Sequence, residues 1–134
     1  MEIIGNGVDI VENKRIKNSL KNKNFINRVF TQNEINKSKK LINKINYYAK
    51  RFAAKEAFAK AIGEGFRNNI NFGDIEVTND KKGKPIIKIS NNIKNFLKKK
   101  FKLSKYKIFL SLSDEKKHSI AYVIINKQKW LKNL

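Results

Sequence analysis

Residues 51–63, RFAAKEAFAKAIG, place one acid among small and basic side chains in a segment whose composition predicts a helix. At 3.6 residues per turn, Glu56 and Lys60 lie one turn apart on the same stripe as Ala53 and Ala57. This spacing suits phosphate chemistry, because a carboxylate can bind a metal ion while an ammonium neutralises a phosphate. The simpler interpretation is a solvent-exposed ion pair worth about 0.2 to 0.5 kcal/mol. The methyl groups permit close approach by another strand or a ligand.

Asp9 is a second acid that could do chemistry, because Val8 and Ile10 flank it in an otherwise apolar segment that favours a strand. Burying an unpaired carboxylate there would be costly, so something must compensate its charge. A metal ion, a lysine or a water-exposed position at the end of the strand would each serve. Gly5 and Gly7 reduce the side-chain bulk on the face of Asp9, which predicts room for a ligand or another subunit.

Together the two acids predict a metal site, provided that the fold brings Asp9 and Glu56 close. Two carboxylates form a partial oxygen cage that suits Mg²⁺, which keeps several waters and takes its remaining ligands from substrate phosphates. Lys60 would then neutralise the charge that builds on a transferring phosphoryl group. The spacing alone does not establish that the acids converge.

The elements that must position these residues follow from hydrophobic periodicity and capping signals. Thr31 and Glu34 form a capping box that begins a helix, and Gly63 is suited to ending the long central helix. Helices are predicted at about 13–20, 25–30, 31–41, 45–62 and 91–101, and strands at 2–12, 75–78, 85–89, 107–113 and 119–125. Helices and hairpins in groups, without a βαβ rhythm, predict an α+β fold in which a mostly antiparallel sheet packs helices on one face. We expect one domain over residues 1–134, with a tail at 127–134 that either docks or frays.

Composition limits the chemistry and the setting. The chain has no Cys, which excludes disulfides, zinc–thiolate sites and thiol nucleophiles. No apolar run is long enough to span a membrane and no signal peptide precedes the first strand, so we expect an unexported, cytoplasmic protein. The net charge of +20 suggests an anionic partner, although Lys and Asn codons rich in A and T would explain it equally well. The charge alone supports a nucleic-acid-binding module as an alternative, but no zinc, RNA-binding or helix-turn-helix pattern accompanies it.

Three motifs in order, GNGVDIVE at 5–12, RFAAKEAFAKA at 51–61 and NDKKGKP at 79–85, carry a family resemblance. The chain resembles the holo-acyl-carrier-protein synthases of the 4′-phosphopantetheinyl transferase family over about residues 2–126. The resemblance implies transfer of 4′-phosphopantetheine from coenzyme A to a serine of apo acyl carrier protein, in support of fatty acid biosynthesis. It also implies that Asp9 and Glu56 bind Mg²⁺ and that Lys60 contacts the phosphates. The general base is either Glu56 or a metal-bound water.

The resemblance assigns further residues to the coenzyme. Arg51, with Gly83, Lys84 and Pro85 of the hairpin turn, matches positions at the nucleotide end of coenzyme A. Turn chemistry alone would also explain Gly83 and Pro85, and Arg51 would otherwise be a solvated helix cation.

Acidic carrier proteins dock, in this family, on the helix after the first strand. Arg15 and Arg28 match the docking arginines, while Asn24 stands where some relatives have a basic residue, which puts one contact in doubt. Codon bias would explain lysines here, but two arginines among many lysines favour carboxylate recognition.

Two residues are left outside the predicted site. His118 favours a role in a hairpin turn over a role as ligand or base, because no partner lies close in sequence. Asp114 stands where several relatives have histidine, and its charge would repel phosphate. Short members of the family form trimers with coenzyme A between subunits, so the resemblance implies a homotrimer. An inactive scaffold that only binds the carrier is disfavoured, because both acids and Lys60 are present.

Overall fold

The computed structural model describes residues 2–66 and 70–128. Its elements are β1 (Glu2–Glu12), α1 (Asn13–Ser19), α2 (Lys23–Val29), α3 (Gln32–Ser38), α4 (Lys44–Ala61), the 3-10 helix η1 (Phe72–Asp74), β2 (Ile75–Asn79), β3 (Pro85–Ile89), α5 (Asn91–Phe101), β4 (Tyr106–Asp114) and β5 (His118–Lys127). Each predicted helix and strand is found, with bounds shifted by a few residues. The predicted tail overlaps the end of β5, and its residues 129–134 lie outside the described residues.

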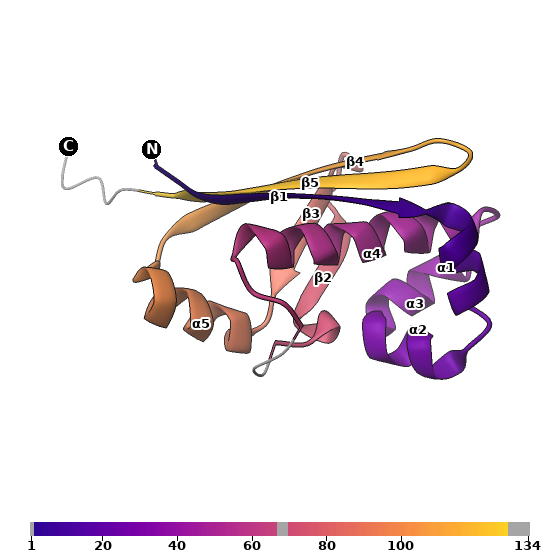
Figure 1. The fold of residues 1–134 in the computed structure, drawn as a ribbon, viewed down its shortest axis with the longest axis horizontal. Helices are drawn as coiled ribbons and strands as arrows, with labels where there is room; N and C mark the ends of the chain where they lie inside the picture. The colour runs from indigo at the N-terminus through magenta and orange to yellow at the C-terminus, as the bar shows by residue number, and fades with distance from the viewer. Residues whose placement is uncertain (1, 67–69, 129–134) are drawn as a thin grey trace.

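The strands form two antiparallel sheets. β1, β5 and β4 make one sheet in that order, while β2 and β3 make a separate pair. Both predicted hairpins are confirmed, with Asn79 opposite Pro85 and Asp114 opposite Ser119 at their turns. The expectation of one sheet is refined, because β3 lies against β4 without continuing its hydrogen-bonded ladder. Figure 1 shows α4 running along one face of the three-stranded sheet, with the other helices farther from it on the same side.

β1 approaches α4 closely because Gly5 and Gly7 have no side chains. A Cβ atom added to Gly7 would lie 1.9 Å from the carbonyl oxygen of Ala57, and one added to Gly5 would lie 1.9 Å from that of Ala61. Ala53 and Ala57 are fully buried in the same core. The expectation that another strand approaches the alanine surface is therefore confirmed, whereas the expectation that Gly5 and Gly7 leave room for a ligand or another subunit is wrong. The glycine and alanine surfaces pack on each other within one chain, since small residues on both elements let the two backbones meet.

The capping box at the start of α3 is confirmed. The Thr31 hydroxyl accepts a hydrogen bond from the Glu34 amide, and the Glu34 carboxylate accepts one from the Thr31 amide. The predicted end of α4 is also found, with Gly63 in the left-handed conformation at φ +71°. The helix near residues 31–41 ends earlier than predicted, at Ser38, whose hydroxyl bonds to the backbone of Ile35 and to the Tyr48 hydroxyl.

The face of the three-stranded sheet turned away from α4 carries exposed apolar side chains. Val8 and Ile10 of β1 are 47% and 63% exposed, and Ile120 and Tyr122 of β5 and Phe109 of β4 are also exposed. Val11, Ala121 and Val123 on the opposite face are buried in the core. The sheet is thus covered by helices on one face, as predicted. Among the described residues, no helix is long and apolar enough to cross a membrane.

Candidate active site

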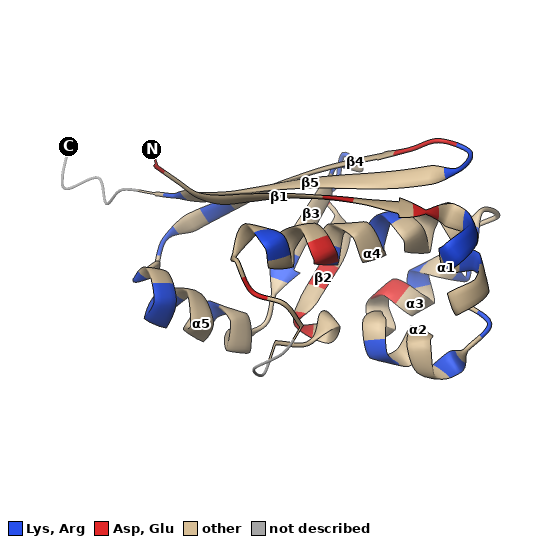
Figure 2. Cartoon of the chain, in the orientation of Figure 1, with Lys and Arg blue, Asp and Glu red and all other residues tan. Residues whose placement is uncertain are grey.

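Asp9 and Glu56 come together where β1 crosses α4. Burial raises the pKa of the Glu56 carboxyl above its usual range, and the negative charge of Asp9 raises it further. Lys60 and Arg15 oppose this shift because their positive charges favour the ionised carboxylate. Two acids that repel each other in this way form a site that favours a bound cation. Asp9 and Glu56 are therefore close enough to interact electrostatically, as the convergence hypothesis requires. Figure 2 shows β1 and α4, which carry them, side by side.

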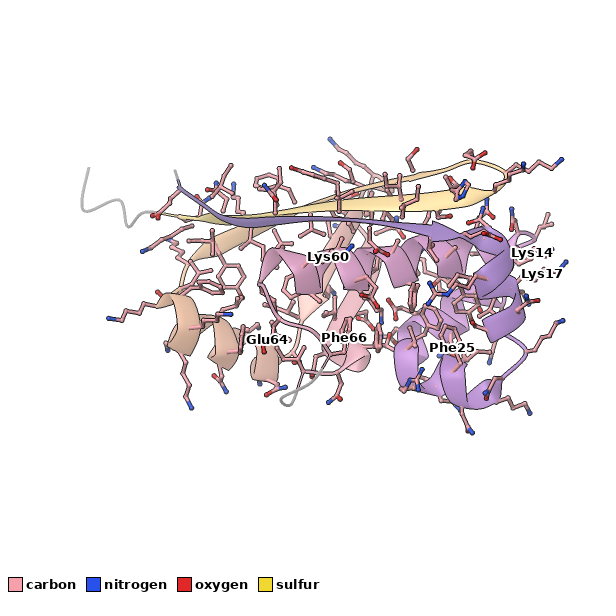
Figure 3. The ribbon with its side chains drawn as sticks, viewed as in Figure 1. Lys14, Lys17, Phe25, Lys60, Glu64 and Phe66 are labelled. Atoms are coloured by element: carbon pink, nitrogen blue, oxygen red, sulfur yellow. The ribbon has the colours of Figure 1, made fainter. Side chains whose placement is uncertain are left out.

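Lys60 lies at the open side of this acid pair. Its ammonium donates to Asp9 Oδ1 and to the carbonyl of Val8, each at 3.0 Å. The Lys60 side chain is 56% exposed, whereas that of Asp9 is 16% exposed. Figure 3 shows Lys60 on α4 beneath β1. The i,i+4 pairing of Glu56 with Lys60 is thus not the main contact, because the ammonium reaches across to the strand.

The donor set fits a magnesium ion better than a transition metal. The described residues hold no group of three or more His, Cys, Asp and Glu side chains able to bind a metal. Two carboxylates alone suit Mg²⁺, which keeps several waters and completes its shell with phosphate oxygens. The raised pKa of Glu56 supports this fit, since a bound cation would relieve the repulsion between Glu56 and Asp9.

The two predicted docking arginines lie on separate helices. Arg15 is exposed on α1, close enough to Glu56 to act on its carboxylate. Arg28 is exposed on α2 and lines a cavity of about 460 Å³ together with Phe66, Asn71, Phe72 and Gly73. Asn24, the position in doubt, has its backbone amide bonded to the side chain of Asn22 at the start of α2.

The aromatic wall beside Arg28 was not predicted from the sequence. The rings of Phe66 and Phe72 stack with their centres 3.7 Å apart, and Phe72 stacks in turn on Phe52 of α4. Figure 3 shows Phe25 on α2 and Phe66 on the segment after α4, on the side of α4 away from the sheet. The sequence feature that could have predicted this wall is the presence of phenylalanines at 25, 66 and 72 in segments that also carry charge.

Arg51 is buried, so the interpretation as a solvated helix cation is wrong. Its guanidinium lies 3.6 Å above the ring of Tyr47 and donates to Asn79 Oδ1 at 3.3 Å. The amide of Asn79 donates in turn to the carbonyl of Gly83 at 2.9 Å. Arg51 is thereby joined to the β2–β3 turn, so the residues that the resemblance assigns to the nucleotide end lie together.

The β2–β3 turn is preformed by its own residues. Asp80 Oδ1 accepts from the backbone amides of Lys82 and Lys84 at 2.9 Å, and Gly83 has a φ of +86°. Pro85 begins β3. Turn chemistry thus accounts for Gly83, while Lys84 stays exposed and available to an anion.

Within one chain, the arginine and turn group does not lie on the same side of α4 as the acid pair. Arg51 and Glu56 are five residues apart, which turns their side chains by about 140° around the helix axis. Arg51 contacts β2 through Asn79, whereas Glu56 faces β1 and α1. The predicted coenzyme residues therefore form two separate groups.

A buried ion pair between α3 and α4 was also missed. Lys55 and Glu34 have side chains 0% and 1% exposed, and their charged atoms lie 2.7 Å apart. The sequence assigns Glu34 only to the capping box, and lysine is seldom buried, so no local pattern predicts this contact. Burial lowers the pKa of the Lys55 ammonium, and Glu34 opposes that shift.

The two residues left outside the site lie on the β4–β5 hairpin. His118 lies at the turn, as its interpretation as a hairpin residue predicts. It bonds there to Glu115 at 3.0 Å, so the expectation that it has no partner close in sequence is wrong. Asp114 accepts from Asn46 at 2.7 Å and pairs with Lys50 at 3.5 Å, so its charge is directed toward α4.

The fold is that of a known class of enzymes. Residues 5–123 match the family model of the 4′-phosphopantetheinyl transferase superfamily, to which the chain belongs. Within that class it is a member of the holo-acyl-carrier-protein synthase family. It is 61% identical over 128 residues to the holo-[acyl-carrier-protein] synthase of Pelagibacter ubique, covering 96% of this chain and 100% of the relative.

Solved structures agree with this assignment. The holo-[acyl-carrier-protein] synthase of Neisseria meningitidis matches with a TM-score of 0.85 and 37% identity, covering 94% of this chain and 100% of that one. The enzyme from Bacillus anthracis, solved in complex with CoA (3′,5′-ADP), matches with a TM-score of 0.78 and 37% identity over 94% of this chain and 98% of that one. The family match favours an enzyme over the nucleic-acid-binding module that the charge alone suggested.

Proposed function

We propose that this protein transfers the 4′-phosphopantetheine group of coenzyme A to a serine hydroxyl of apo acyl carrier protein, in support of fatty acid biosynthesis. The reaction depends on Mg²⁺ and releases adenosine 3′,5′-bisphosphate. The observation that carries this proposal is the convergence of Asp9 and Glu56 beside Lys60, in a chain of this family. We also propose that residues 1–134 form one domain and that the protein works in the cytoplasm.

The residues divide the chemistry among them. The serine oxygen forms a bond to the β-phosphorus of coenzyme A while the bond from that phosphorus to the bridging oxygen breaks. Asp9 and Glu56 would hold Mg²⁺, which supplies positive charge to the diphosphate when bound. Lys60 is free to swing toward the phosphates, because its side chain is more than half exposed. Glu56, or a water held by the metal, is the proposed acceptor of the serine proton.

The carrier is proposed to dock over α1 and α2. Arg15 and Arg28 are exposed there, and the aromatic cavity beside Arg28 would take an apolar side chain. A partner that offers carboxylates next to an apolar side chain fits this surface, and an acidic acyl carrier protein has that chemistry. Arg15 also lies near Glu56, which places the docking surface next to the acid pair.

A homotrimer would bring the two groups of coenzyme residues together. Arg51, Gly83, Lys84 and Pro85 of one chain are proposed to bind the nucleotide end of the coenzyme whose diphosphate lies at Asp9 and Glu56 of a neighbour. The exposed apolar face of the three-stranded sheet supports association between copies, because such patches are rare on monomers.

The transfer itself is tested by intact mass spectrometry of apo acyl carrier protein incubated with the enzyme, coenzyme A and Mg²⁺. We expect the carrier to gain one phosphopantetheine, and Asp9→Asn and Glu56→Gln to slow this gain by about 100-fold or more, by loss of charge stabilisation. Glu2→Gln, which neutralises an exposed acid at the start of the same strand, is the matched control. An unchanged carrier mass with wild-type enzyme across metal and salt conditions would refute the proposed function.

The shared site is tested by co-expressing two inactive variants, Asp9→Asn and Arg51→Met. If the site is built from two chains, mixed trimers contain some sites with neither substitution, and part of the activity returns. Light scattering should give about three times the chain mass of 15.6 kDa. Ile120→Lys, on the exposed sheet face, should reduce that mass to a single chain. A wild-type enzyme that is active as a single chain would refute the trimer.

A further inference from the structure

The buried ammonium of Lys55 donates a complete set of hydrogen bonds within the protein. Its ammonium donates to the Val29 carbonyl at 2.6 Å, to Glu34 Oε1 at 2.7 Å and to the Phe72 carbonyl at 3.1 Å. An ammonium has three donors, and all three are used, so the charged form is fully satisfied despite its burial. A lysine with no donor left for solvent or ligand is fixed in one position.

Two of the three acceptors of Lys55, Val29 and Phe72, belong to the segments that carry the cavity beside Arg28. Val29 is the last residue of α2 and follows Arg28 directly, while Phe72 begins η1 and lines the cavity with its ring. Glu34 connects Lys55 to β2, because its second oxygen accepts a hydrogen bond from the Val77 amide of β2 at 2.8 Å. One ammonium on α4 therefore holds α2, η1 and, through Glu34, β2.

Lys55 also precedes Glu56, so the same turn of α4 carries this anchor on one side and the acid pair on the other. If α2 and η1 shift, Arg28 and the aromatic wall move relative to Glu56. The metal acids do not depend on the anchor in the same way. Asp9 and Glu56 are held by the close packing of Gly5 and Gly7 on α4.

We propose that Lys55 is a positioning residue that sets the place of the carrier-docking surface relative to the acid pair, an inference that rests on the proposed function. Its ammonium does not contact either substrate. It aligns the wall formed by Arg28 and Phe72 so that a docked carrier presents its serine at the acids. Loss of Lys55 should therefore weaken the handling of the carrier and leave that of coenzyme A intact.

The test compares Lys55→Met with Lys50→Met, the same substitution on the same helix at a partly exposed ion pair. We expect the KM for apo acyl carrier protein to rise on the order of tenfold in Lys55→Met, because small misplacements of a docking surface have large effects. The KM for coenzyme A should stay within about twofold, and Lys50→Met should leave both values unchanged. A purely structural role would lower the active fraction, and with it kcat, without separating the two KM values.

A second variant tests the inference if Lys55→Met does not fold. Glu34→Gln combined with Lys55→Met removes both charges, so no unpaired carboxylate stays buried. Hydrogen exchange of this variant should show lost protection in α2 and η1 with protection in β1 retained, and labelled apo carrier should bind more weakly. Unchanged carrier KM and carrier binding in a folded variant would overturn the inference. That result is distinct from failure of the proposed function, in which the wild-type enzyme transfers nothing.

Discussion

Two neighbouring residues of α4, Lys55 and Glu56, belong to charged clusters of opposite character. Lys55 and Glu34 form a closed pair, buried and fully hydrogen-bonded. Glu56 and Asp9 form an open pair of like charges, with an exposed lysine at their side. The closed pair is complete without a ligand. The open pair favours further positive charge, as the proposed site for a metal ion and a phosphate requires.

The two clusters also differ in how much they contribute to the stability of the fold. A buried, satisfied ion pair fixes geometry, because removing either partner leaves an uncompensated charge. An exposed lysine beside two acids contributes little to stability, since solvent screens it. The comparison therefore predicts that substitutions on the two sides of one helix have opposite balances of stability and activity.

The largest expected effect on stability is that of Lys55→Met. The substitution leaves Glu34 buried without its cation, and we expect the free energy of unfolding to fall by about 3 to 5 kcal/mol. Urea unfolding followed by circular dichroism measures it. The double variant with Glu34→Gln should lose less than the single variant, because the buried charge is gone. Equal losses in the two variants would contradict the idea that the uncompensated charge of Glu34 is what destabilises Lys55→Met.

The next largest effect on stability is expected for Gly7→Ala, which disrupts the packing of β1 on α4 that brings the open pair together. The new Cβ would lie 1.9 Å from the Ala57 carbonyl, a backbone atom that cannot move aside easily. We expect a loss of about 1 to 3 kcal/mol in the free energy of unfolding. The rise in Tm caused by Mg²⁺ in the wild type should also shrink, because β1 carries Asp9.

Gly73→Ala is the control for Gly7→Ala, since nothing lies within 4 Å of an added Cβ at Gly73. It should unfold in urea as the wild type does. A Gly7→Ala protein with wild-type stability would mean that β1 and α4 can separate freely, and the close approach of the two backbones would then not be what positions Asp9.

The open cluster could be predicted from the sequence, whereas the closed one could not. An acid between Val8 and Ile10 and a lone acid on an Ala-rich helix are unusual enough locally to indicate chemistry. Glu34 and Lys55 are 21 positions apart, and each has an ordinary local explanation, as a capping residue and as a helix lysine. Only tertiary packing reveals that they meet.

The same distinction applies to the fold. Hairpin turns, the capping box and the end of α4 depend on neighbouring residues, and all were predicted correctly. The partner of the Gly5 and Gly7 surface was not, because a run of small residues indicates close packing without indicating which surface fills it. The burial of Arg51 was missed for a similar reason, since Tyr47 and Asn79 come from different elements.

A smaller effect is expected for Glu56→Gln, with a size that depends on pH. The pKa of Glu56 is raised in the folded protein, which therefore binds this proton more tightly than the unfolded chain does. Stability from this group is present below the unfolded pKa and is lost as pH rises through the raised pKa. The uncharged variant escapes that loss, so its Tm should exceed that of the wild type at neutral pH and match it in acid.

Calorimetry across pH, with and without Mg²⁺, tests the Glu56→Gln prediction. Mg²⁺ should raise the Tm of the wild type and not that of the variant, because ligand binding stabilises only a protein that can bind it. A variant that is less stable than the wild type at neutral pH would mean that attraction to Lys60 and Arg15 outweighs burial and repulsion by Asp9.

The smallest effect on stability is expected for Lys60→Met, the same substitution as Lys55→Met five residues along α4. The ion pair with Asp9 is exposed on the side of Lys60, so its loss should cost at most about 1 kcal/mol in the free energy of unfolding. Raising the salt concentration should reduce even this difference, since salt screens exposed pairs. A loss as large as that of Lys55→Met would contradict the division into a closed and an open cluster. If the loss is small while phosphopantetheine transfer falls strongly, the positive charge of Lys60 is used on the phosphates of the substrate and not on the fold.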